Sequence, residues 1–174
     1  MRVDEYAICQ IPEINLSCYG CCGRHLKSKE AVEKDIEENT RDFSRIDIPS
    51  TVRLLDFRDR FSKDNGDVKG SGICSNLVKF RCGVVACPLH KLINKIVPAD
   101  EFMAIHRKDL RWGHCDVNFE CRSVKIFKKL PEDERRRFLN WIREQRFDNY
   151  KYSKLMVDGV LIKRYLKKVN IRVF

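Results

Sequence analysis

The sequence predicts a mostly α fold in a single small globular domain, with irregular cysteine-bearing loops closed around a metal site. Its length of 174 residues suits one domain with one core. Apolar residues recur mainly at helical spacing, and the nine cysteines fall largely between the helical segments. We expect one domain over residues 1–174, in which 1–121 form a cysteine-cluster metal-binding region and 122–174 form basic C-terminal helices.

The composition is ordinary for a soluble protein, at 43% hydrophobic and 34% charged residues. The sequence has no apolar run of about 18 residues, the length of a membrane-spanning helix. Its first residues, Met1 to Tyr6, contain no apolar signal segment. We therefore expect a cytoplasmic protein with no membrane partner. Nucleotide-binding, hydrolase and metalloprotease motifs are absent from the sequence, so whether it is an enzyme is left open.

The first predicted helix spans residues 28–44. Residues 1–27 precede it and read as irregular, because Pro12, Gly20 and Gly23 interrupt them. Ser28 is a favourable N-cap, and apolar side chains then share one helical face. That face carries Val32, Ile36 and Phe43.

Shorter elements are expected in the middle of the chain. Apolar spacing predicts a helix over 51–61, followed by a turn at 64–67, a bend at 70–72 and an extended piece over 77–80. Pro88 is placed in the first turn of another short helix.

The C-terminal third is predicted to be helical. One helix runs over 121–129, a second begins at Pro131, and a final one follows Asp148-Asn149. In that final helix Gly159 is expected to weaken the helix by about 1 kcal/mol without ending it.

The positive charge of the chain lies in this same third. The net charge is +10, and residues 122–174 hold 16 Lys and Arg against 6 Asp and Glu, whereas the acids and bases of residues 1–121 cancel. A basic face can meet nucleic acid or another acidic partner, although a solvated helical surface is the simpler interpretation.

Three thiols fall within the segment Cys18-Tyr19-Gly20-Cys21-Cys22-Gly23. Thiolates are soft ligands suited to zinc and iron–sulfur clusters, and clustered cysteines in a reducing compartment favour metal over disulfides. A C-x2-C pair on a glycine-containing turn directs both sulfurs at one ion. The adjacent Cys22 points elsewhere, toward a multi-iron cluster, a second metal or the protein interior.

The remaining cysteines lie some fifty residues further on. This spacing differs from a zinc ribbon, whose two knuckles are about 15–20 residues apart. The site must therefore be closed by tertiary structure, which couples metal binding to folding. Cys9 is predicted to be a packed thiol. The predicted metal ligands are Cys18, Cys21, Cys22, Cys74, Cys82, Cys87, Cys115 and Cys121.

The segments Cys18-x2-Cys21-Cys22, Gly72-x-Cys74-x2-Leu77 and Cys87-Pro88 resemble the YkgJ-type cysteine-cluster family, described as zinc- or iron-chelating. The resemblance covers about residues 16–122 and implies that the five cysteines of these segments are metal ligands. Cys82 would fill the place of a further family cysteine, and the block from Gly113 to Cys121 looks like an extension with two more. A weaker similarity, confined to the cysteines, is to the iron–sulfur segment of flagellin lysine methylases.

We therefore expect a metal-binding protein with an iron–sulfur cluster of the 4Fe–4S type or one to two zinc ions, at least in a structural role. The Cys21–Cys22 pair favours iron–sulfur, and His90 or His114 is considered as a replacement for one thiolate. One alternative is an iron–sulfur enzyme or electron-transfer protein acting in protein modification. A second is a nucleic-acid-binding module using the basic C-terminal helices. A protein partner is compatible with the sequence, and a nucleic-acid partner is less favoured.

Overall fold

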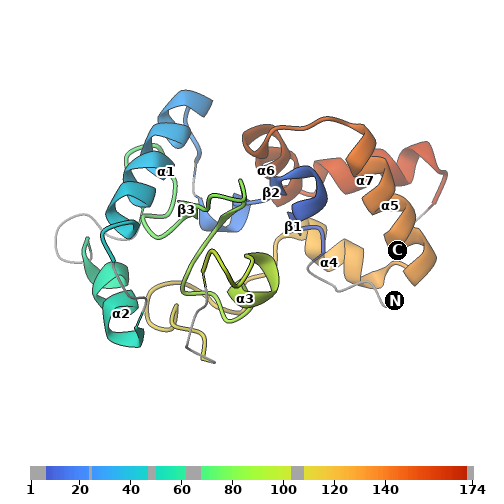
Figure 1. Cartoon of the computed structure of the whole chain (residues 1–174). Coiled ribbons are helices and arrows are strands. Elements are labelled where there is room, and N and C mark those ends of the chain that lie inside the picture. The colour runs from blue at the N-terminus through green and yellow to red at the C-terminus, as the bar shows by residue number, and fades with distance from the viewer. Residues whose placement is uncertain (1–6, 24, 47–49, 62–67, 103–107, 172–174) are drawn as a thin grey trace. The chain divides into compact units, whose positions relative to one another are not determined.

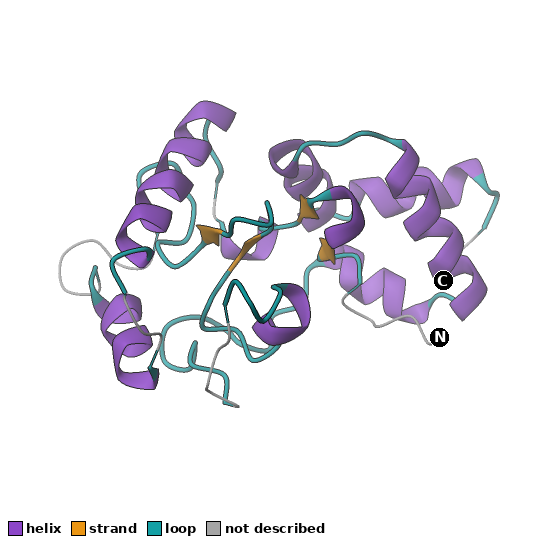
Figure 2. Cartoon of the chain, viewed as in Figure 1, coloured by secondary structure: helices purple, strands orange, loops and turns teal. Residues whose placement is uncertain are grey.

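Helices dominate the computed structural model, which describes residues 7–23, 25–46, 50–61, 68–102 and 108–171 (Figure 2). This confirms the mostly α class. The helices are α1 (Lys29–Phe43), α2 (Thr51–Asp59), α3 (Ile93–Ile96), α4 (Arg122–Lys129), α5 (Glu132–Glu144), α6 (Asn149–Val157) and α7 (Val160–Lys168), with short 3-10 helices η1 (Pro12–Ile14) and η2 (Gly20–Cys22). The strands are β1 (Gln10–Ile11), β2 (Leu16–Ser17), β3 (Val78–Lys79) and β4 (Val85–Ala86).

The chain divides into two compact units. Unit 1 combines Met1–Cys21 with Glu120–Phe174, and unit 2 is the continuous segment Cys22–Phe119. The predicted cysteine-cluster region, residues 1–121, is thus shared between the two units.

Unit 2 contains α1 packed against β3 (Figure 1). The hydroxyl of Ser28 accepts the N–H of Ala31, so the predicted N-cap and the predicted helix are both confirmed. Ser50 caps α2 in the same way, and β3 pairs with β4 as an antiparallel hairpin. The core of the unit is aromatic, because Phe43 lies with its ring centroid 5.2 Å from Phe57 and 5.5 Å from Phe102.

Unit 1 contains α4–α7 and the β1–β2 hairpin, whose register pairs Gln10 with Ser17 and Ile11 with Leu16. The amphipathic helices bury one face each, with Phe127 and Phe138 fully enclosed. The hairpin is fixed to this helical core by Tyr152, whose buried hydroxyl donates to the Ile8 carbonyl at 2.7 Å.

Some boundaries differ from the predictions. The final helix is two helices, because Gly159 adopts φ 71° and ends the first of them. The short helix expected at Pro88 begins at Ile93, and Pro131 stands just before α5 as its N-cap residue. The segment 1–27 contains the β1–β2 hairpin. The predicted turn at 64–67 lies outside the described residues.

Within the described ranges, the structure has no helix with the length and apolar character needed to cross a membrane.

Candidate metal centre

The loop that carries Cys18 is attached to α6. Ser17 donates its backbone N–H to Asn149 Oδ1 at 2.8 Å, and Tyr19 donates its N–H to Ser153 Oγ at 2.9 Å. The backbone N–H of Cys18 donates to the Cys9 carbonyl at 2.8 Å. Side chains of α6 therefore satisfy the backbone on both sides of this cysteine.

Gly20 allows the same loop to approach α6 closely. A Cβ at this position would lie 2.8 Å from the Ser153 carbonyl oxygen and 3.0 Å from Val157 Cβ. The first distance is shorter than a real Cβ contact, and its partner is backbone, which cannot easily move. The glycine of the C-x2-C segment is therefore required for packing against α6.

Cys121, at the start of α4, acts electrostatically on Cys18 of this loop. It is buried, it is the N-cap residue of the helix, and the N–H groups of Ser123 and Val124 hydrogen-bond to its sulfur. Burial raises the pKa of Cys121, and the charge of Cys21 raises it further, whereas these N–H groups lower it.

Cys18 is under the same influences. Burial raises its pKa, and the charges of Cys21 and Cys121 add to the rise, whereas the Gly20 N–H at its sulfur and the nearby Ser153 hydroxyl oppose it. Because Cys21 and Cys121 both act on the pKa of Cys18, and Cys21 acts on that of Cys121, we call these three cysteines the first thiol group.

In unit 2, Cys74 is bonded to the cysteine segment at the start of the unit. Its N–H donates to the Cys22 carbonyl at 2.6 Å, beside a bridge between Gly23 and Ile73. The Asn76 N–H reaches the Cys74 sulfur at 3.5 Å. A donor directed at sulfur stabilises the thiolate, which is the form that binds metal.

The turn from Cys74 to Leu77 is positioned by a buried polar network. Asn39 of α1 is fully buried, and its Nδ2 donates to the carbonyls of Cys74 and Leu77 at 3.1 Å each. Arg60, just after α2, donates to Asn39 Oδ1 at 3.3 Å and to the Ser75 carbonyl at 2.5 Å. Side chains from α1 and from the end of α2 thus hold this cysteine turn in place.

Cys87 follows β4 and is joined electrostatically to Cys74 and Cys115. Burial raises its pKa, and the charges of Cys74 and Cys115 raise it further. The Leu89 N–H at its sulfur and the nearby Arg111 guanidinium lower it. We call Cys74, Cys87 and Cys115 the second thiol group.

The loop carrying Cys115 is tied to Cys87 through the backbone. The Leu110 N–H donates to the Leu89 carbonyl at 3.0 Å, and the backbone N–H of Cys115 donates to the Arg111 carbonyl at 3.2 Å. Asp109 binds the Arg111 side chain through both carboxylate oxygens, at 2.8 and 2.7 Å. This pair fixes a positive charge beside the second thiol group.

Neither candidate histidine offers a nitrogen lone pair to a metal in this conformation. His90 Nδ1 accepts the N–H of Leu92 at 3.0 Å, so the neutral ring carries its proton on Nε2. His114 Nε2 lies 2.7 Å from Asn76 Nδ2, and the Asn76 amide is oriented by Arg60, which donates to its Oδ1 at 3.0 Å. His114 Nε2 therefore accepts, and cysteines remain the better ligands.

Cys9, Cys22 and Cys82 belong to neither group, although the Cys9 and Cys22 carbonyls accept the N–H groups of Cys18 and Cys74. Cys82, predicted as a ligand, lies in the β3–β4 turn, where its N–H donates to Glu101 Oε2 at 2.8 Å. Burial and the Glu101 carboxylate both raise the Cys82 pKa, which disfavours its thiolate. Cys9 packs against the hydrophobic core of unit 1, as a packed thiol does.

The predicted ligands are therefore distributed over both units. The first thiol group belongs to unit 1 and the second to unit 2, and the boundary between the units falls between Cys21 and Cys22. In the described part of the chain, no three His, Cys, Asp or Glu side chains are placed to hold a metal ion. Comparisons with protein-family models, curated proteins and solved structures found no match.

Proposed function

We propose that this protein binds a metal through its cysteine thiolates, either as zinc or as an iron–sulfur cluster. The observation that carries the proposal is a repeated local geometry. Four of the proposed ligands have a backbone N–H at their sulfur from the residue two positions further on: Cys18 from Gly20, Cys74 from Asn76, Cys87 from Leu89, and Cys121 from Ser123. Cys82, which is not among these ligands, receives the Val84 N–H in the same way.

This geometry supports ligation more than simple packing. A buried thiol needs no donor at its sulfur, since it is a small apolar group, whereas a thiolate is stabilised by each N–H directed at it. The raised pKa values of Cys18 and Cys87 nevertheless keep these groups protonated without a cation. A bound metal supplies that cation and releases the protons.

The proposal gives each unit its own set of ligands. Cys18, Cys21 and Cys121 would hold metal in unit 1, and the second thiol group would do so in unit 2. Cys22, whose carbonyl accepts the Cys74 N–H, would be the fourth thiolate there. The metal would supply structural cross-linking of loops that have little regular structure of their own.

The decisive experiment is metal analysis of the protein purified without oxygen. A brown protein containing iron and sulfide supports a cluster, and a colourless protein with stoichiometric zinc supports zinc. Single Cys→Ser variants then locate the ligands: Cys18→Ser in the first group and Cys74→Ser in the second should each lose metal, while Cys9→Ser should keep it. A wild-type protein without metal, or full metal content in both ligand variants, would refute the proposal.

A further inference from the structure

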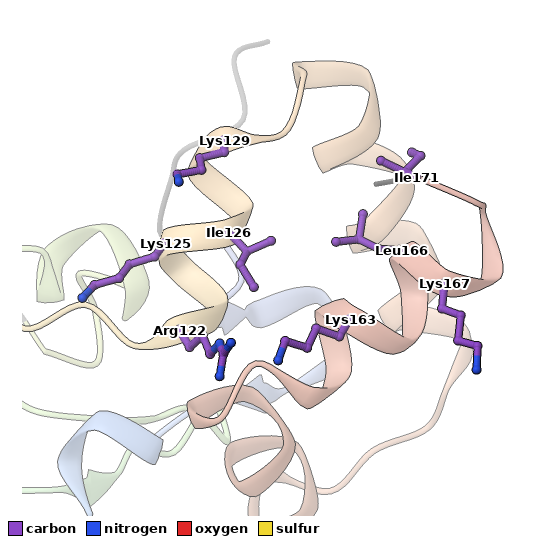
Figure 3. Close-up of a pocket in the computed structure, with 8 residues that line it drawn as sticks. All are labelled: Arg122, Lys125, Ile126, Lys129, Lys163, Leu166, Lys167 and Ile171. Carbon is purple, nitrogen blue, oxygen red and sulfur yellow. The ribbon is translucent and has the colours of Figure 1, made fainter. Parts of the chain in front are cut away.

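A groove in unit 1 lies between α4 and α7 (Figure 3). Its volume is about 450 Å³. Five cationic side chains and three aliphatic ones line it, and the lining contains no acid. The cations are Arg122, Lys125, Lys129, Lys163 and Lys167, and the aliphatic side chains are Ile126, Leu166 and Ile171.

Helical spacing produces this lining. Arg122, Lys125, Ile126 and Lys129 stand at i, i+3, i+4 and i+7 and so share one face of α4. Lys163, Leu166 and Lys167 occupy the corresponding face of α7, and the two helices pack against each other. The cations are exposed, whereas Leu166 is buried, so the aliphatic residues form a floor between two basic walls.

Two backbone features fix the edges of the groove. Asn170 ends α7 in a left-handed conformation, φ 54°, and the Ile171 N–H donates to the Leu166 carbonyl at 3.0 Å. At the other end, a Cβ on Gly159 would lie 3.0 Å from Arg122 Cγ, so this glycine makes room for the arginine stem. The two ends of α7 thus place Ile171 at one edge and leave room for Arg122 at the other.

The positive charge of the groove is uncompensated within the described residues. None of its five cations forms an ion pair there, while several cations elsewhere in unit 1 do. Lys128, on the other side of α4, pairs with Glu120, and Arg136 and Arg137 of α5 pair with acids of their own helix. The groove therefore brings five uncompensated cations together around an apolar floor.

We propose that this groove binds an acidic amphipathic helix of a partner protein. A helix laid between two helices buries its apolar side chains on the floor and directs its carboxylates to the basic walls. Four of the five cations are lysines, which bind single carboxylates as point charges. A nucleic acid fits less well, because bases stack on aromatic side chains and the lining has none.

The test uses the full-length protein and a synthetic fluorescent peptide with Leu at i, i+3, i+4 and i+7 and Glu at the other positions. Two probes of equal charge accompany it, the same peptide with Ser in place of Leu and a single-stranded RNA. Binding is followed by fluorescence anisotropy at physiological salt. We expect the Leu peptide to bind about tenfold more tightly than the Ser peptide, because only the former covers the apolar floor.

Matched charge reversals on α7 locate the binding. Lys163→Glu with Lys167→Glu alters the groove, and Arg164→Glu with Lys168→Glu makes the same charge change on exposed neighbours outside the lining. The groove variant should weaken peptide binding by about tenfold, since each attraction becomes a repulsion. The neighbour variant should bind nearly as the unmodified protein does, and circular dichroism should confirm that both variants are folded.

Ile126→Ser separates a peptide groove from a general basic surface. It removes part of the floor without changing the charge, so it should weaken binding of the Leu peptide and leave that of the Ser peptide unchanged. The proposal would be overturned by RNA binding more tightly than the Leu peptide, by equal binding of the two peptides, or by equal losses in the two charge-reversal variants.

Discussion

The hydroxyl of Ser153 makes a sharp test of how the Cys18 loop is held. Ser153 is fully buried, and its Oγ accepts the N–H of Tyr19, which is only 2% exposed. Ser153→Ala removes this acceptor and leaves a buried donor without it, which costs about 1–3 kcal/mol. The same hydroxyl donates to the Asn149 carbonyl at 2.6 Å. Losing this bond costs less, because the Asn149 carbonyl also accepts a backbone hydrogen bond within α6. We expect a decrease of about 2 kcal/mol in the free energy of unfolding of unit 1.

Ser123→Ala is the matched control. Ser123 is equally buried, but its hydroxyl donates to the Met156 carbonyl, which also accepts N–H groups from Asp158 and Gly159. No polar group loses its last partner, so this change should cost less than about 1 kcal/mol.

The assay is urea unfolding followed by tryptophan fluorescence in a Trp112→Phe background. The chain has two tryptophans, so Trp141, which packs against the helical core of unit 1, is then the only reporter. Equal destabilisation by the two Ser→Ala changes would refute the reasoning, because it would mean that the Tyr19 N–H does not depend on Ser153.

Three further predictions concern positions outside the thiol groups. Gly159→Ala should lower the melting temperature of unit 1 and cost about 1–2 kcal/mol, because φ is 71° and the added Cβ would meet the Arg122 stem; an unchanged melting temperature would contradict this. Asn39→Ala should destabilise unit 2 by about 1–3 kcal/mol in urea unfolding, since the buried Leu77 carbonyl loses its donor and the Cys74 carbonyl keeps only the Leu77 N–H; a loss near zero would mean that the network does not hold the turn. Burial and Arg111 lower the pKa of His90 from 6.5 to about 4, so NMR titration should find the ring neutral at pH 5. Because the unfolded chain binds the extra proton first, stability should fall as the pH drops from about 6.5 toward 4, and His90→Gln should reduce that fall.

Local signals in the sequence were sufficient for α1 and α2 of unit 2. Ser28 and the spacing of Val32 and Ile36 defined α1, since an N-cap and an apolar face are both read from neighbouring residues. The prediction that Gly159 lies within one continuous helix was wrong, because it considered only the intrinsic cost of glycine in a helix and not the backbone conformation of this residue. The left-handed φ and the packing of Arg122 against this glycine depend on tertiary structure, which a local penalty does not include.

The cysteines could be recognised from the sequence as candidate ligands, but their grouping could not. Cys121 affects Cys18 across about a hundred residues of chain, and only the fold of unit 1 brings them together. Asn39 is another such case. In the sequence, Asn39 cannot be distinguished from the other polar residues of its helix. In the structure it is fully buried and supports a turn 35 residues away.

The division of the chain also bears on the order in which it folds during synthesis. Unit 2 is contiguous, so every residue of Cys22–Phe119 has emerged before the last helices are made. The first 21 residues, in contrast, belong with α4–α7 and emerge long before their partners. On a ribosome adding about 5–20 residues per second, the β1–β2 hairpin waits several seconds for α6 and α7. Over that interval its apolar side chains and the thiols of Cys18 and Cys21 are exposed to chaperones, oxidants and metal carriers of the cell.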